Sequence, residues 1–225
     1  MNYCPIQRIV YKNKKNKQGQ EELIKVRELA FPDFYDYDYY YFQAIEIAQD
    51  QGKHLCVAKA RRKGYSYKGG SMLCRNFFLI PGSKSYVYAS NKQYLTDDGI
   101  LTKAWDYMDF IDENTAWGKK RQAVNTSMRR RASMIVTDNF GNKIEVGYKS
   151  EIIGVSLKDN PDAVRGKAGM LILWEEAGTF PELKAAWQIA RPSVEQDGVA
   201  FGLMIMFGTG GDEGPAVMTL REAIL

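Results

Sequence analysis

Two short stretches of the sequence carry residue types that could bind a chain of phosphate groups and hydrolyse the anhydride bond between them. The first, residues 55–70, reads LCVAKARRKGYSYKGG: an apolar run, a loop rich in positive charge, a glycine, a hydroxyl residue and the start of a helix. This is the order of a phosphate-binding loop, in which backbone N–H groups and the positive end of a helix dipole face an anion. The second, residues 170–177, reads MLILWEEA, an apolar run that leads into two acids.

The loop departs from the common pattern G-x-x-x-x-G-K-[ST] at its charged position. When Gly64 and Ser66 are aligned with the last glycine and the hydroxyl, Lys59 replaces the first glycine and Tyr65 replaces the lysine. Ser66 can still bind Mg²⁺, but Tyr65 has no charge to offer a β- or γ-phosphate. We expect Lys59 to reach back across the loop and supply that charge. Taken alone, the loop also fits a solvated, arginine-rich turn after a strand.

The two acids, Glu175 and Glu176, follow an apolar run that is typical of a buried parallel strand. At the carboxyl end of such a strand, one carboxylate would complete a Mg²⁺ shell and the next would polarise the attacking water. The competing interpretation is a surface helix that begins with two acids, which its dipole would favour. The phosphate loop earlier in the chain favours the strand.

The composition limits the class of protein. The chain has 225 residues, of which 45% are hydrophobic and 26% charged, which suits one soluble α/β domain with a substantial core. No apolar run approaches the ~20 residues of a membrane span, and the N-terminus lacks the apolar core of a signal peptide, so we expect a cytoplasmic protein without a membrane partner. The wide spacing of the three cysteines and the single histidine, His54, argue against a zinc site or a Cys/His or Ser/His nucleophile. The net charge of +4 permits a polyanionic partner without requiring one.

The remaining segments supply the elements that must position these residues. Residues 1–20 are polar and basic and suggest a mobile arm, either solvated or in contact with DNA, and we expect residues 21–225 to form the main domain. The triplet Arg129–Arg131 is either a solvated surface or a nucleic-acid contact. We expect helices over residues 21–30, 42–48, 65–79, 91–108, 181–190 and the tail 215–225, strands over residues 55–58, 85–89, 170–174 and 199–207, and a hairpin made by residues 134–136 and 143–149.

Two further residues could touch a nucleotide. Gln43 follows an aromatic stretch, FPDFYDYDYYYF, that could form an adenine pocket in which the amide reads the base edge. The same rings could instead pack against the flank of the sheet. Thr209 lies in a glycine-rich tip after the strand at 199–207, where it could sense a γ-phosphate or form part of a tight turn.

These stretches, in this order, resemble the ATPase domain of the large terminase subunits of tailed bacteriophages, the motors that package DNA. Residues 59–66, KARRKGYS, are similar to the deviant Walker A motif of lambda-type terminases, with its displaced lysine and a tyrosine after the glycine. Gln43 matches the family's upstream glutamine motif, and Arg165–Gly166 matches an arginine–glycine pair before the second motif. Residues 171–176 match the hydrophobic run that ends in acids, and residues 208–211 match the coupling motif. The resemblance covers about residues 40–211.

The resemblance implies a P-loop NTPase fold of the ASCE type, a mostly parallel β-sheet flanked by helices on both faces, with ATP and Mg²⁺ as cofactors. Lys59 would be the phosphate lysine, Ser66 and Glu175 the metal ligands, and Glu176 the catalytic base. Arg62 or Arg165 would act as an arginine finger or sensor, in cis or toward a neighbouring subunit. The nucleotide-binding residues would be Gln43, Lys59, Ala60, Arg61, Arg62, Lys63, Gly64, Tyr65, Ser66 and Thr209.

The function that the resemblance implies is Mg-ATP hydrolysis coupled to the translocation of double-stranded DNA into a procapsid, in the cytoplasm of the host cell. The implied partners are DNA, the portal protein, the terminase small subunit and further copies in a ring on the procapsid, with a monomer expected in isolation. Glu175 replaces the family's usual aspartate, and the chain has no room for the family's nuclease domain, so we expect no DNA cleavage. The alternatives are a non-catalytic nucleotide- or DNA-binding module with a degenerate loop, and a superfamily-2-like helicase core, which would need further motifs on a second core domain.

Overall fold

The computed structural model describes residues 5–158 and 160–209, and the chain divides into two compact units, Met1–Phe42 and Gln43–Leu225. The predicted helical tail, the glycines at 210 and 211, and Cys4 lie outside the described residues. Within the described part of the chain, no helix is long and apolar enough to cross a membrane.

The first unit contains a long antiparallel hairpin. Strands β1 (Ile6–Lys15) and β2 (Glu21–Ala30) pair over their whole length. The turn between them is closed by Asn16, whose side-chain oxygen accepts hydrogen bonds from the backbone N–H groups of Gln18 and Gln20 at 3.0 and 2.9 Å. The boundary expected after residue 20 therefore falls inside the turn of this hairpin.

This hairpin overturns the prediction of a helix over residues 21–30, and it gives residues 6–15 of the expected basic arm a strand conformation. Leu23, Val26 and Leu29 recur at a helical spacing, but burial in β2 alternates from one residue to the next, as it does in a strand. The partner that selects the strand is β1, a separate segment of the chain. A local periodicity cannot show whether such a partner exists, and pairing with it overrides a modest helical preference.

The second unit is built on a central sheet of seven strands. Its order from one edge to the other is β3 (Leu55–Lys59), β13 (Leu203–Thr209), β10 (Leu171–Trp174), β4 (Lys84–Ala89), β9 (Glu151–Ser156), β6 (Arg129–Arg131) and β5 (Val124–Asn125). Neighbours among the first five strands are parallel, and β6 and β5 are antiparallel additions at the β9 edge. The predicted mostly parallel sheet is confirmed.

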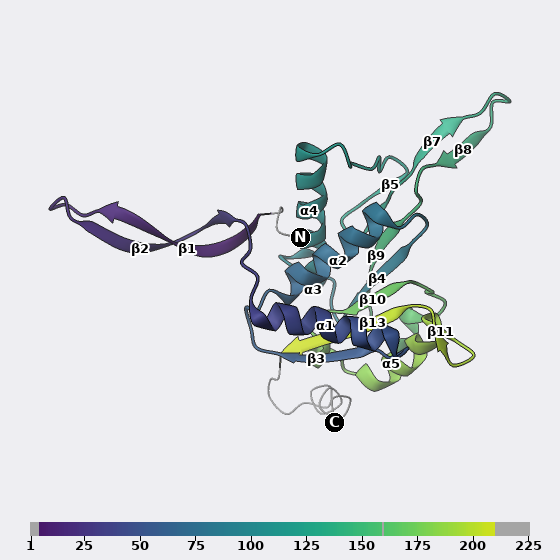
Figure 1. The fold of residues 1–225 in the computed structure, drawn as a ribbon. Coiled ribbons are helices and arrows are strands. Elements are labelled where there is room, and N and C mark those ends of the chain that lie inside the picture. The colour runs from purple at the N-terminus through teal and green to yellow at the C-terminus, as the bar shows by residue number, and fades with distance from the viewer. Residues whose placement is uncertain (1–4, 159, 210–225) are drawn as a thin grey trace. The chain divides into compact units, whose positions relative to one another are not determined.

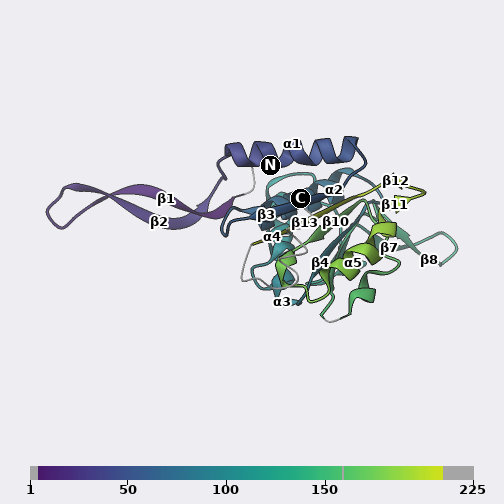
Figure 2. The ribbon, with the colours of Figure 1, turned by 90° about the horizontal axis from the view of Figure 1, so that it is seen from below.

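Helices cover both faces of this sheet, as predicted, because both faces of its central strands are apolar (Figures 1 and 2). On one face, helix α5 (Leu183–Ala190) buries Leu183, Ala186 and Ala190 in a core with side chains of β4, β10 and β13. On the other face lie α2 (Tyr65–Leu79) and α4 (Ile100–Asn114). Gly69 lets α2 approach α4 and β10 closely, since a Cβ there would lie 2.4 Å from Ile100 Cδ1 and 3.2 Å from Leu173 Cδ1.

The remaining elements are helices, hairpin strands and turns. They are α1 (Asp36–Asp50), α3 (Gln93–Thr96), the hairpin β7 (Met134–Thr137) and β8 (Lys143–Val146), the pair β11 (Glu195–Gln196) and β12 (Val199–Ala200), and the 3₁₀ turns η1 (Pro161–Val164), η2 (Ala177–Thr179) and η3 (Arg191–Ser193). The predicted hairpin at β7–β8 is confirmed (Figure 1).

The structure also differs from the prediction at one helix, one strand segment and one strand that was not predicted. The helix expected from residue 91 onward is interrupted at Gly99, where a Cβ would lie 2.0 Å from the carbonyl oxygen of Tyr94. The segment 199–207 contains two strands, β12 and β13. Strand β9 was missed because its run of glutamate, isoleucines, glycine, valine and serine carries no clear two-residue alternation.

Candidate nucleotide site

The loop between β3 and α2 brings backbone N–H groups to the carboxyl edge of the sheet. Gly64 precedes the first residue of α2 with φ of 72°, in the left-handed region that glycine adopts without strain. Arg62 also has a positive φ, 63°, so the loop turns sharply before the helix begins. Ser66 lies in the first turn of α2, the end of the helix whose dipole and exposed N–H groups favour an anion.

Lys59 and Glu176 form the centre of the site. The ammonium Nζ of Lys59 lies 2.8 Å from Oε1 of Glu176, and the Lys59 side chain is only 8% exposed. Lys59 ends β3 and Glu176 follows β10, which are separated in the sheet by β13. The predicted meeting of the displaced lysine with the second acid is therefore found in the structure.

Ser66 and Glu175 form a second contact beside the first. The Ser66 hydroxyl donates a hydrogen bond of 2.7 Å to Oε1 of Glu175. Glu175 is buried, with 4% of its surface exposed. Burial raises the pKa of Glu175 to about 7, helped by the charge of Glu176 and opposed by the Ser66 hydrogen bond and the charge of Lys59. The other oxygen, Oε2, is buried and has no hydrogen-bond partner among the residues that the structure describes.

These two side chains fit a hard divalent cation. A serine hydroxyl and a carboxylate are oxygen ligands of the kind that Mg²⁺ prefers, and the unpartnered Oε2 of Glu175 offers a further lone pair. The ammonium of Lys59 lies near this pair, since its charge acts on Glu175. Glu175, with one methylene more than aspartate, still reaches Ser66, so the replacement noted in the sequence does not separate the two groups.

The backbone of Glu176 is held in an unusual conformation. Its φ of 48° and ψ of 55° place it in the left-handed region, which is unfavourable for a residue with a side chain. Its carbonyl oxygen accepts hydrogen bonds from both the N–H (2.9 Å) and the Oγ1 (2.8 Å) of Thr179. Oγ1 of Thr179 also lies 2.7 Å from Oγ of Ser90, beyond the end of β4.

Thr179 is a site residue that our sequence reasoning missed. The signal was present, since a threonine three residues after an acid often bonds back to the backbone in a turn. It could not be recognised without knowing that the chain turns tightly at Glu176, after the end of β10.

Thr209 lies beside the central pair. It pairs in register with Lys59 on the neighbouring strand, and its hydroxyl lies 3.5 Å from Oε2 of Glu176. Its strand, β13, lies between the strands that carry the lysine and the acids.

The other residues of the loop face solvent or support its shape. Ala60, Arg61, Arg62 and Lys63 are exposed. The ring of Tyr65 packs 6.0 Å from that of Phe207. Lys68, which the sequence did not single out as a site residue, donates a hydrogen bond of 2.9 Å from Nζ to the carbonyl of Lys63, and its Nζ lies 4.1 Å from the Tyr65 ring centroid. Lys68 therefore ties α2 back to the loop.

Two predicted residues lie apart from the central contacts. Gln43 is exposed on α1. Arg165 follows η1 with a side chain that is 68% exposed, and its Nε lies 2.7 Å from Oδ1 of Asp162 on the surface. The contacts described for Lys59 and Glu176 do not include either residue.

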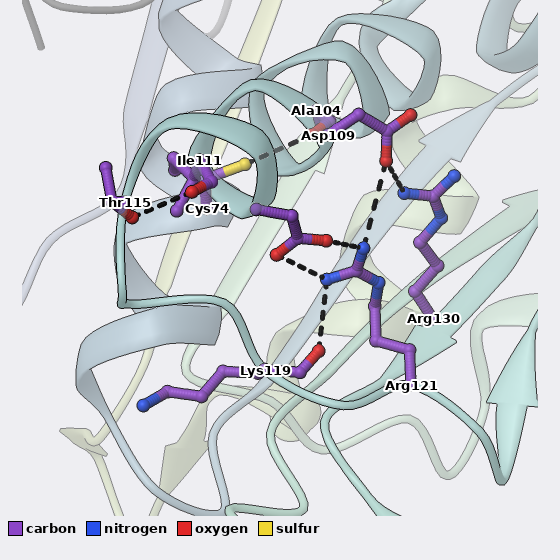
Figure 3. Close-up of polar contacts among 9 residues, drawn as sticks. Cys74, Ala104, Asp109, Ile111, Thr115, Lys119, Arg121 and Arg130 are labelled. Carbon is purple, nitrogen blue, oxygen red and sulfur yellow. Dashed lines mark hydrogen bonds and ion pairs between the residues drawn. The ribbon is translucent and has the colours of Figure 1, made fainter.

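The arginines near β6 are paired with acids. Arg130 lies 3.0 Å from Asp109, and Arg121 bonds Asp112 and the carbonyl of Lys119 (Figure 3). The Arg130 guanidinium also stacks over the ring of Trp105. Arg129 and Arg131 both pair with the buried Glu151. These ion pairs give the triplet a structural role at the sheet edge, which neither of the two interpretations drawn from the sequence included.

Comparison with known proteins adds information on the fold. No family model matches the sequence, and no curated protein matches it. Two solved structures of the large terminase ATPase domain of Thermus phage P74-26 are similar to this chain. One, of a point mutant, has a TM-score of 0.55 and 17% identity over 80% of this chain and 72% of that one. The other has a TM-score of 0.52 and 20% identity over 79% of this chain and 71% of that one. The chain thus has the fold of a bacteriophage large terminase ATPase domain.

Proposed function

We propose that this chain is an ATPase motor domain of a DNA-packaging terminase, which hydrolyses Mg-ATP to move double-stranded DNA into a procapsid. The observation that carries the proposal is the meeting of four side chains at one sheet edge: Lys59 with Glu176, and Ser66 with Glu175. The similarity of the fold to a terminase ATPase domain supports the choice of this motor class.

Each side chain has a role that follows from its position. The Ser66 hydroxyl and Glu175 would hold Mg²⁺, and the proton that the raised pKa of Glu175 retains near neutral pH would leave as the cation binds. Lys59 would bind an oxygen of the β- or γ-phosphate. Bound Mg²⁺ supplies neutralisation of the charge that develops on the transferring phosphoryl group.

Glu176 would orient and deprotonate the attacking water. Its partly exposed carboxylate is held by Lys59 at Oε1 and lies near Thr209 at Oε2, and its backbone is fixed by Thr179. Thr209 would report the state of the γ-phosphate to β13. In this scheme an arginine, Arg62 or Arg165, stabilises the transferring group.

The assembled motor would be a ring of copies on the procapsid, with the portal protein and the terminase small subunit as partners, in the cytoplasm of the host cell. The exposed guanidinium of Arg165 suits a role toward a neighbouring subunit.

The substitution Glu176→Gln tests the proposal. We expect wild type to show Mg²⁺-dependent ATPase activity and the variant to lose about 10²- to 10⁴-fold in kcat, because the base is lost while the shape is kept. Nucleotide affinity should change little, as measured with a fluorescent ATP analogue. A variant that retains full turnover would refute the assignment of the base, and an absence of turnover in both proteins would favour the non-catalytic binding module.

A further inference from the structure

We propose that the β1–β2 hairpin of one copy docks on the aromatic segment 31–40 of a second copy. The inference concerns assembly and does not depend on ATP hydrolysis. It begins from the fact that β1 and β2 form a sheet of only two strands, ten residues each. A two-stranded hairpin that no other surface covers is only marginally stable in water, so we expect another protein surface to bind one face of this hairpin.

One face of the hairpin exposes an apolar stripe. Ile9, Tyr11, Leu23 and Leu29 are each between 59% and 63% exposed. The register pairs Ile9 with Arg27 and Tyr11 with Lys25, which makes Ile9 a diagonal neighbour of Leu29 and Tyr11 a diagonal neighbour of Leu23. The four side chains thus line one face of the twisted ribbon from its base toward its turn.

The same face is positively charged. Lys25 and Arg27 lie among the apolar side chains, and Lys15 lies near the turn, opposite Glu21. The surface that would cover this face must therefore be apolar and either acidic or rich in aromatic rings, which attract cations at their faces.

Residues 31–40, FPDFYDYDYY, have that chemistry. Phe34, Tyr39 and Tyr40 are 59%, 55% and 65% exposed, and Asp36 is exposed beside them. The sequence from Phe31 to Gly52 contains no lysine or arginine. One chain thus carries both a cationic, apolar ribbon and an acidic, aromatic surface.

Within one copy, residues 31–40 cannot cover the whole length of the β1–β2 hairpin face. Arg8, near the base of the hairpin, already bonds Asp33 and the carbonyl of Phe31 in its own copy. Strand β2 then carries Leu23 about 25 Å from Phe31 at ~3.3 Å per residue. The outer part of the ribbon meets such a segment on another copy. Because the two contacting faces differ, the interface is heterologous and generates a ring or an open chain of copies.

Duplex DNA is the less suitable occupant of this face. A β-ribbon can enter the major groove, but the side chains that read bases and phosphates are polar, and this face exposes four large apolar groups. A protein surface, unlike a DNA groove, would bury these four apolar side chains.

Sedimentation velocity over a concentration series tests the interface. We expect wild type to be monomeric when dilute and to associate as its concentration rises, and we expect the double variant Tyr11→Ser/Leu23→Ser to need at least tenfold higher concentration for the same assembly. The matched control is Ile135→Ser/Phe140→Ser in the β7–β8 hairpin, whose side chains are 51% and 89% exposed; it should assemble as wild type does. A wild-type chain that stays monomeric throughout, or a double variant that assembles normally, would overturn the proposal.

Charge reversal gives a second test that does not depend on the folding of one variant. Lys25→Glu/Arg27→Glu and Asp36→Lys should each assemble weakly alone and regain assembly when mixed, because each supplies the surface that the other has lost. Failure to recover on mixing would contradict the pairing of these two faces.

Binding to a duplex oligonucleotide is measured in parallel by fluorescence anisotropy. If Lys25→Glu/Arg27→Glu lost DNA affinity with assembly unchanged, the face would belong to DNA and the proposal would fail.

Discussion

Lys59 and Glu176 depend on each other in the site, because each neutralises the charge of the other. Lys59 is nearly buried, and its contact with Glu176 at 2.8 Å keeps two opposite charges together at the end of the sheet. Removal of one partner leaves the other charge in a poorly solvated position, which costs free energy. The common lysine position of the loop is filled by Tyr65, whose ring packs near Phe207 and cannot replace this charge.

Replacement of this lysine is the sharpest test at the residue scale. We expect Lys59→Ala to lower kcat/KM for ATP by about 10²-fold or more, since a preorganised cation at the phosphate is lost. Lys63→Ala is the matched control, because Lys63 lies in the same loop and is exposed. Steady-state ATPase rates and nucleotide affinities of both variants check the expectation. Equal losses in the two variants would show that the phosphate lysine has been misassigned.

His54 provides a pH-dependent contribution to stability at the residue scale. Its Nδ1 accepts a hydrogen bond of 3.3 Å from the backbone N–H of Met204, and its Nε2 lies 2.9 Å from Oε1 of Glu195. Burial lowers the pKa of His54 below its usual 6.5, against the opposing influence of Glu195. The unfolded chain therefore binds a proton more readily than the folded one, so this contribution is complete above about pH 6.5 and is lost as the pH falls.

We expect wild type to lose more stability between pH 7 and pH 5.5 than the variant His54→Gln, which can accept the same hydrogen bond but cannot titrate. The free energy of unfolding in urea at the two pH values measures this difference. Parallel curves for the two proteins would mean that His54 titrates alike in the folded and unfolded states.

At the scale of elements, the turn after β10 links the site to β4. Thr179 of η2 bonds the carbonyl of Glu176 through both its N–H and its hydroxyl, and that hydroxyl also contacts Ser90. These contacts stabilise the left-handed conformation that directs the Glu176 side chain toward Lys59. Thr179 is thus a positioning residue for the proposed base.

The variant Thr179→Val should lower kcat about tenfold and leave nucleotide affinity nearly unchanged, because it disturbs only the orientation of Glu176. Thr115→Val is the matched control, since the Thr115 hydroxyl makes a similar bond to a carbonyl, 2.7 Å from Ile111, at the end of α4. The split between kcat and KM distinguishes positioning from binding. An equal effect of the two substitutions would indicate a general loss of stability.

At the scale of the whole molecule, the described contacts pair Arg165 with a surface acid and not with the four side chains of the site. Arg165 is exposed after η1 and pairs with Asp162, whereas Lys59 and Glu176 contact each other at the ends of β3 and β10. If Arg165 serves a neighbouring copy, activity requires assembly. The expectation is that Arg165→Ala lowers the rate per subunit at high protein concentration, by about 10³-fold for a full arginine finger, and leaves nucleotide affinity unchanged.

The matched control for this arginine is Arg191→Ala. Arg191 also forms an exposed ion pair with an acid a few residues away, Glu195. Rates measured across a range of protein concentrations should separate Arg165→Ala from both wild type and this control. A normal rate for Arg165→Ala at concentrations where the protein assembles would remove Arg165 from the mechanism.

Local patterns predicted most of the second unit. The apolar runs of β3, β4 and β10 and the start of α2 at Tyr65 were readable because each has a clear local pattern. The hairpin β1–β2 was not, because β2 is selected by its pairing with β1, and β9 was not, because its residues show no clear two-residue alternation. The same limit applied to Thr179, whose role depends on a turn that forms only after β10 is in place.

The sequence alone determined which groups are available for chemistry: a displaced lysine, a hydroxyl after a glycine, and two acids after an apolar run. Tertiary structure decided which of them meet. With β13 between β3 and β10, the parallel strands end at one edge, and this brings Lys59 to Glu176 and Ser66 to Glu175. It also set Arg165 apart and paired the arginines near β6 with acids. The physical reason is that strand order and long-range pairing depend on contacts between distant segments, which no local spacing of residues encodes.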